Sequence, residues 1–185
     1  ALQANAGIVG PKVLDGQDST RLDDMGATVD RLGSPVPRVA PGEADQGQHD
    51  GRLDVFASSE GAVMGRADLF AALGGFDGSI CSPNGHVDLC WRARLIGAST
   101  LLVPTAVGRR LGGTPARRRR IHSDIIGPRH RLRMTLANRF GPRSLAVLAE
   151  SVVATLLGLV YGLLAGRFRF VWGRLSAWGW NKRRL

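Results

Sequence analysis

The sequence of 185 residues is poor in several features that define protein classes. It has only two cysteines, which excludes a small scaffold built on disulfides, and its 25 glycines follow no triplet period, which excludes a collagen-like chain. No Gly-x-Gly-x-x-Gly or Walker sequence occurs, and the sequence offers no credible nucleophile triad. We therefore expect neither a phosphate-binding loop of these kinds nor hydrolysis by a triad.

Acidic residues are scarce in one part of the chain only. Residues 1–104 contain 8 basic and 13 acidic side chains, net −5, whereas residues 105–185 contain 17 basic and 2 acidic side chains, net +15. Only Lys12 and Lys182 among the 25 cations are lysines. Since 44% of the residues are hydrophobic, the chain can still bury a core. The overall charge of +10 therefore averages two dissimilar regions.

The start of the chain has no secretory signal. It begins at Ala1, without the basic, apolar and small-residue series that marks such a signal. Cys81 and Cys90 give little support for a disulfide, and free thiols suit a reducing cytoplasm better than the exterior. We expect the chain to be a piece of a longer cytoplasmic or membrane-bound protein.

The first half contains short apolar runs separated by polar text. Residues 7–14 predict a strand at a sheet edge, or two short strands, because Pro11 interrupts them. Residues 15–51 are rich in turn-forming residues and predict a long excursion with one or two short strands. Residues 53–57 and 61–64 are apolar runs of strand length.

Two helices are predicted next. The first begins at Arg66 or Ala67 and ends at Gly74-Gly75, where residues without Cβ can take positive φ. The second begins near Ser82-Pro83, a plausible N-cap followed by proline at the first helical position.

An apolar stripe on the second helix, a glycine after it and a proline after the next strand complete this region. The second helix is expected to bury Leu89, Ala93 and Ile96 and to end at Gly97. A buried strand over 98–103, closed by proline, follows. Strands on both sides of two helices predict an α/β fold.

The last third differs in kind. Arg109-Arg110 and residues 117–120 predict an exposed charged loop, and residues 128–140 a cationic helix. Residues 144–166 are 23 residues with one charge, Glu150, which is enough to cross a bilayer core of about 30 Å at about 1.5 Å per residue.

Tryptophans and arginines follow this apolar run. Trp172, Trp178 and Trp180 lie among arginines, a pattern typical of a helix at an anionic membrane interface. We expect residues 144–185 to form membrane-spanning or interfacial helices. The alternative is an apolar helix packed inside a larger protein.

Three segments in order resemble a known family. Residues 74–77 are Gly-Gly-Phe-Asp, residues 87–94 are Val-Asp-Leu-Cys-Trp-Arg-Ala-Arg closed by Gly97, and an apolar strand follows. This series resembles the second half of the catalytic domain of family 2 glycosyltransferases of the GT-A fold. Residues 45–50, Asp-Gln-Gly-Gln-His-Asp, followed by Asp54-Val-Phe, look like the membrane-anchored actinobacterial members that build cell-surface polysaccharides.

The resemblance implies a fold, a reaction and an organisation. The fold would be a partial, Rossmann-like GT-A α/β domain, incomplete at its N-terminus, over residues 1–104. A basic linker and helix over 105–143 and membrane helices over 144–185 would follow. The reaction would be inverting transfer from a nucleotide-sugar donor to a cell-surface polysaccharide or a lipid-linked acceptor, at the cell membrane with the catalytic part on the cytoplasmic side.

The family also uses a divalent metal, Mg²⁺ or Mn²⁺. Its ligands lie mostly in an N-terminal half with an Asp-x-Asp motif, and no suitable Asp-x-Asp occurs here. We therefore expect this chain to supply the acceptor and base side, to hold no metal itself and to be inactive in isolation.

The catalytic base is where the chain departs from the family. An acceptor hydroxyl must lose a proton as it attacks, so a base near its working pH lowers the barrier. The family places a Glu-Asp pair just before the aspartate that is Asp88 here, which maps the pair onto Gly85 and His86. A neutral imidazole could accept the proton, since its reference pKa is about 6.5. Equally, loss of the carboxylate could mark an inactive enzyme.

Further site residues follow from the resemblance, each with a structural alternative. Asp88 would line the acceptor site or orient the base, or else form a surface ion pair with Arg92, four residues on. Asp77 could bind sugar hydroxyls or cap a turn. Trp91 could stack on a sugar, although a tryptophan between apolar neighbours in a helix is more often core. Gly74, Gly75, Phe76 and Arg92 would complete the substrate-binding residues.

Other functions carry less weight. The arginine-rich third could hold nucleic acid, but no stacking aromatics are interleaved with its cations and an apolar helix follows it, so we do not expect nucleic acid as a partner. A zinc site on Cys81, His86 and Cys90 would need a distant fourth ligand. His49 could contact substrate, yet loop histidines are more often solvated.

Overall fold

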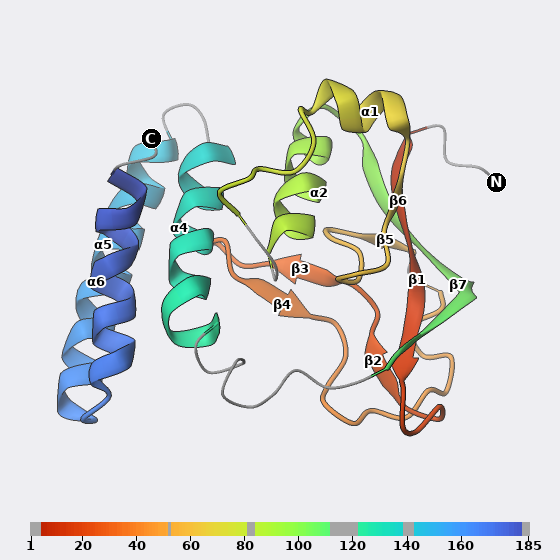
Figure 1. Ribbon diagram of the computed structural model, residues 1–185, viewed down its shortest axis with the longest axis horizontal. Helices are drawn as coiled ribbons and strands as arrows, with labels where there is room; N and C mark the ends of the chain where they lie inside the picture. The colour runs from red at the N-terminus through yellow and green to blue at the C-terminus, as the bar shows by residue number, and fades with distance from the viewer. Residues whose placement is uncertain (1–4, 52, 81–83, 112–121, 139–142, 183–185) are drawn as a thin grey trace. The chain divides into compact units, whose positions relative to one another are not determined.

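The computed structural model describes most of the chain as two compact units (Figure 1). The described residues are 5–51, 53–80, 84–111, 122–138 and 143–182. The sheet unit takes its described residues from 1–29, 35–78 and 85–113. The helical unit takes its described residues from 30–34, 79–84 and 114–185.

A mixed sheet forms the sheet unit, and β1 (Ala6–Asp15) lies inside it. β1 pairs in parallel with β7 (Ser99–Arg110), and the two run side by side in Figure 1. β1 also pairs antiparallel with β2 (Leu22–Asp24) and β6 (Met64–Gly65), and β5 (Asp54–Val55) pairs antiparallel with β7. The predicted α/β class is confirmed, whereas the expectation that the first strand lies at an edge is wrong.

Pro11 is tolerated inside the sheet because the pairing is irregular there. Pro11 lies opposite Val103 and Lys12 opposite Val107, so β7 gains three residues at this point. The antiparallel partners of β1 pair with residues before and after Pro11, but not with Pro11 itself. The residue without an N–H thus lies at the point where the pairing of β1 with β7 changes register. The same irregularity lets β7 pass through Pro104, which corrects the prediction that this proline closes the strand.

The excursion after β1 holds three short strands rather than one or two. β2 joins the main sheet, while β3 (Ala27–Val29) and β4 (Pro35–Pro37) form a separate antiparallel pair. This region contributes Leu22, Met25 and Val39 to a core cluster whose other members are Leu14, Val55 and Leu102.

The helices of the sheet unit end where glycine permits. α1 (Ala67–Ala72) is followed by Gly74 and Gly75, with φ of 72° and 73°, which confirms the predicted stop. α2 (Gly85–Leu95) contacts β1 and β7 and buries Leu89 and Ala93 as predicted. Ile96 is 61% exposed, contrary to prediction, because the chain has already left the helix toward Gly97, whose φ is 89°. The predicted start at Ser82-Pro83 lies outside the described residues.

The helical unit contains a π-helical turn, η1 (His122–Ile126), and three α-helices. These are α4 (Gly127–Asn138), α5 (Arg143–Leu164) and α6 (Phe168–Lys182), and α6 packs against the other three elements. The predicted cationic and apolar helices are thus present. Arg109 and Arg110 belong to β7 instead of the predicted loop, and residues 117–120 lie outside the described residues.

Candidate functional site

The turn after α1 is held against α2 by one arginine. Arg92 donates from Nη1 to the carbonyl oxygen of Leu73 at 2.7 Å and from Nη2 to that of Gly75 at 2.8 Å. Its Nε donates to Asp88 Oδ2 at 2.7 Å. The guanidinium therefore joins the Gly-Gly-Phe-Asp turn to the first turns of α2, two of the three segments on which the family resemblance depends.

The ion pair between Asp88 and Arg92 is not a surface pair. The side chain of Asp88 is 3% exposed and that of Arg92 is 21% exposed. A carboxylate so removed from water needs its cation, because an uncompensated buried charge is strongly unfavourable. Since the guanidinium is engaged on three sides by the protein, we assign Arg92 a positioning role in place of direct substrate contact.

His86 lies in the first turn of α2 and is half-buried. Asp88 Oδ2 is directed toward Arg92, one helical turn further along α2. Asp77, in the turn that Arg92 holds, is also half-buried. The structure thus brings the turn at Gly74–Asp77 and the helix carrying His86 together, joined by Arg92 and its pair with Asp88.

The two aromatic candidates have different environments. Trp91 is 7% exposed and meets Phe56 edge to face, with ring centroids 5.5 Å apart. We therefore correct the expectation of sugar stacking and assign Trp91 to the core. Phe76 is 54% exposed and makes an edge contact with Phe70 at 5.4 Å, so its ring stays available at the surface of the turn.

The described residues give no support to a metal site. They contain no group of three or more His, Cys, Asp or Glu side chains placed to hold a metal ion. Cys90 is buried, and burial raises the pKa of its thiol, which opposes the thiolate form that zinc requires. Cys81 lies outside the described residues. No step through a divalent metal can be derived from this chain.

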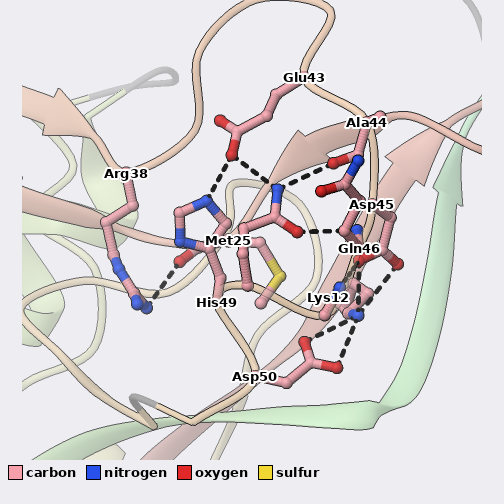
Figure 2. Close-up of polar contacts among 11 residues, drawn as sticks. Lys12, Met25, Arg38, Glu43, Ala44, Asp45, Gln46, His49 and Asp50 are labelled. Carbon is pink, nitrogen blue, oxygen red and sulfur yellow. Dashed lines mark hydrogen bonds and ion pairs between the residues drawn. The ribbon is translucent and has the colours of Figure 1, made fainter.

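A second polar cluster, the Lys12 cluster, is formed by Lys12, Glu43, Asp45, His49 and Asp50 (Figure 2). Lys12 Nζ lies 3.0 Å from Asp45 Oδ2 and 2.7 Å from Asp50 Oδ1, and the lysine side chain is only 7% exposed. His49 Nε2 lies 2.8 Å from Glu43 Oε1. The loop that resembles the actinobacterial motif is therefore fixed to β1 by its acidic residues.

The pKa values in this cluster follow from its contacts. Burial opposes the charged form of Lys12, but hydrogen bonds to Asp50 and Asp45 outweigh it and raise the lysine pKa above its ordinary value. The hydrogen bond from Lys12 lowers the pKa of Asp45. The backbone N–H of Ala40, with Gln48 and His49, lowers the pKa of Glu43 to about 2. Lys12, Glu43 and Asp45 are therefore ionised at neutral pH.

Sequence reasoning missed the partners of Lys12. A signal was present, since Lys12 interrupts a strand that is otherwise apolar and is one of only two lysines. A buried lysine needs a carboxylate partner, and residues 43–50 supply three acidic side chains. Which of them reach it depends on the fold of the loop. His49 is paired with Glu43, and so it is not the solvated loop histidine that was expected.

The comparisons with known proteins add no assignment: no protein-family model and no curated protein matches the chain. In the helical unit, the segment Leu145–Leu164 is long and apolar enough to cross a membrane, with a mean hydropathy of 2.0. Length and composition alone give this result, which is compatible with membrane association and defines no sidedness.

Proposed function

We propose that this chain forms the acceptor side of a membrane-associated family 2 glycosyltransferase of the GT-A type. The reaction would move a sugar from a nucleotide-sugar donor to a cell-surface polysaccharide or lipid-linked acceptor. The observation that supports it most is the Arg92 contact, which joins the Gly-Gly-Phe-Asp turn to the helix carrying His86 and Asp88. Motif segments that are separate in the sequence thereby form one local structure.

The proposed mechanism is general base catalysis. An acceptor hydroxyl loses its proton to His86 as its oxygen attacks the anomeric carbon, and the nucleoside diphosphate leaves with the electron pair of the broken bond. Asp88 and Arg92 act as positioning residues, because they fix the turn that faces the sugar. Phe76 and Asp77, on that turn, would contact the substrate. Donor binding and a divalent metal would belong to a preceding half of the protein.

The proposed location is the cytoplasmic side of the cell membrane. The apolar helix α5 supports a membrane location, and positive charge next to a membrane segment is typical of the cytoplasmic side. Residues 105–185 have a net charge of +15, in agreement with this sidedness.

The test uses the intact gene product that contains this chain, in native membranes. Labelled UDP-, GDP- and dTDP-sugars are supplied with Mg²⁺ or Mn²⁺, and incorporation into lipid and polysaccharide is measured. We expect transfer from at least one donor. His86→Ala should lower kcat by about 10²–10⁴-fold, the usual contribution of a general base. His86→Asp, which restores a carboxylate of the family type, should retain more activity than His86→Ala and shift the pH profile.

The controls separate mechanism from folding. Asp88→Asn removes the charge of the buried carboxylate that pairs with Arg92. Asp68→Asn, its control, makes the same change at an exposed pair with Arg66 and should leave transfer unchanged. Unaltered turnover in His86→Ala would remove His86 from the mechanism. Absence of transfer with every donor would contradict the enzyme proposal and favour the alternative of a non-catalytic glycosyltransferase-like protein.

A further inference from the structure

The helix α5 in the helical unit exposes most of its apolar side chains. On α5 the exposed apolar residues recur at helical spacing along one side, here called the outer face: Leu145, Val152, Val153, Leu156, Leu157, Val160, Leu163 and Leu164. Leu145, Leu157 and Leu164 are 72%, 67% and 85% exposed. Only 17% of the apolar window of this helix is buried. This is the reverse of a helix in a soluble core.

The opposite side of α5, its inner face, is made of small and polar residues that receive α6. α5 and α6 are joined by residues 165–167 and run antiparallel (Figure 1). A Cβ on Gly162 would lie 2.6 Å from Val171, and a Cβ on Gly158 would lie 2.5 Å from Arg174 Cζ, so both glycines admit α6 closely. Trp178 Nε1 donates to Thr155 Oγ1 at 3.1 Å.

The position of Arg174 restricts how the antiparallel pair of α5 and α6, here called the hairpin, can be placed in a membrane. Its Nη1 donates to the carbonyl oxygen of Ala154 at 3.0 Å, and its guanidinium lies 4.5 Å from the centroid of the Phe170 ring. Ala154 is the tenth of the 20 residues in Leu145–Leu164. If α5 crossed a bilayer, the guanidinium would therefore lie near the midplane, held away from either interface. A charge in that position is expensive.

Two further charged groups lie near α5: Arg131 beside the inner face, and Glu150 at the margin of the outer face, seven residues before Leu157. Arg131 of α4 lines a small cavity of about 30 Å³ together with Thr155 and Arg174. Glu150, the one charge in the apolar run, lies 2.9 Å from Arg31, and both side chains are exposed. Water, and not hydrocarbon, suits this exposed ion pair.

We propose that α5 and α6 form a monotopic hairpin that lies in the plane of an anionic lipid surface, with the outer face of α5 in the acyl region and the inner face toward water. Immersion of about 5–10 Å is typical of such helices and leaves Arg174 outside the hydrocarbon centre. The net charge of +15 in residues 105–185 favours anionic lipids over a neutral partner surface. Exposed Phe168 and Trp172, beside exposed Arg169, suit the headgroup boundary.

This inference deepens the proposed membrane location and does not depend on sugar transfer. Its first test measures sedimentation of the full chain with vesicles of phosphatidylcholine alone or mixed with phosphatidylglycerol. We expect retention by the anionic vesicles and partial release at high salt. Leu157→Glu should weaken retention at least about tenfold, since it removes apolar burial and places a charge on the outer face. Leu111→Glu, the same change at an 83% exposed leucine outside the hairpin, should have no such effect.

The second test distinguishes lying on the membrane from crossing it. Ala165→Cys places a single exposed cysteine in the turn between α5 and α6, and Lys182→Cys places one at the C-terminal end of α6, each in a chain also carrying Cys81→Ser. A membrane-impermeant maleimide added outside sealed vesicles should label both positions. Buried Cys90 should stay unlabelled, which reports an intact fold.

Three outcomes would overturn the proposal. Labelling of Ala165→Cys and Lys182→Cys from opposite sides of the membrane would show that the hairpin spans it. Absence of vesicle retention together with concentration-dependent dimers would assign the outer face to a second copy of the chain. Equal retention of Leu157→Glu and the unmodified chain would exclude the outer face as the contact. None of these readouts involves sugar transfer, so failure here leaves the enzymatic proposal standing and separately testable.

Discussion

The two units of this protein distribute polarity in opposite ways. The sheet unit buries Leu22, Met25 and Leu102 and compensates its buried charges with ions of opposite sign, as Asp88 does with Arg92. The helical unit exposes leucines on α5, while Arg174 lies on the inner side and donates to a neutral carbonyl oxygen. The sheet unit therefore buries its apolar side chains, whereas α5 of the helical unit leaves most of its own exposed, the feature from which the membrane proposal starts.

Breaking the buried ion pair should have the largest effect. Arg92→Ala leaves Asp88 uncompensated beneath α2 and frees the turn at Gly74–Asp77. We expect the free energy of unfolding of the sheet unit to fall by about 3–5 kcal/mol. Amide hydrogen exchange in β1 and β7 measures this unit separately. Arg66→Ala, which breaks the exposed pair with Asp68, should cost less than about 1 kcal/mol.

Equal losses in these two arginine variants would show that the Asp88 pair is exposed in solution. The assignment of Arg92 as a positioning residue would then be withdrawn.

Truncating one leucine in each unit tests the contrast directly. Leu102→Ala removes a side chain that is 1% exposed and should cost about 2–5 kcal/mol through lost burial and a residual cavity. Leu157→Ala removes one that is 67% exposed and should change stability in water by less than about 0.5 kcal/mol. Thermal or chemical denaturation of the full chain without lipid provides the measurement. A large loss for Leu157→Ala in water would mean that the outer face of α5 is covered by protein.

Lys12→Met should have a smaller effect than Arg92→Ala. It leaves Asp45 without its buried cation, while Asp50 keeps access to water because its side chain is 40% exposed. We expect a loss of about 2–3 kcal/mol, measured by urea unfolding at pH 7. Lys182→Met, the matched change at the other lysine, is exposed and should be nearly neutral. If Lys12→Met is equally neutral, the carboxylates have found other partners.

The smallest effect concerns pH. The pKa of Glu43 is about 2 in the folded chain and about 4.5 otherwise, so its ionised form stabilises the fold above pH 4.5. That contribution is lost as the pH falls from about 4.5 to about 2. Glu43→Gln should therefore flatten the dependence of the melting temperature on pH in this window. If the melting temperature of Glu43→Gln falls with pH as steeply as that of the unmodified chain, Glu43 is not the source of this pH dependence.

Local signals in the sequence predicted many of the elements. The glycines at 74, 75 and 97 marked helix ends, because positive φ costs them little, and the spacing of Leu89 and Ala93 marked the buried side of α2. Pro11 and Pro104 led to wrong predictions, since each predicts that its strand is interrupted or ends. Both strands continue, because the pairing of β1 with β7 is irregular there. An irregularity between strands about 90 residues apart leaves no local trace.

The candidate site was predictable only in part. The motif series placed His86, Asp88, Gly75 and Phe76 in one region, as the resemblance implied. That Arg92 reaches two carbonyl oxygens across the turn, and that Trp91 belongs to the core, depends on how α2 packs on the sheet. Spacing of four residues predicts the ion pair, but it does not predict its burial.

By itself, the sequence determined the α/β class of the first region, the helix ends at glycine, and the separation of a net-negative part from a net-positive, apolar one. These features depend on local conformational preference and on composition, which neighbours far along the chain do not change. Only the tertiary structure decided which side of each element is covered. It buried Lys12 between two carboxylates, and it placed Arg174 against the middle of α5 with the leucines outside. Burial and charge pairing are properties of side chains that the fold brings together, and a local stretch of sequence does not specify them.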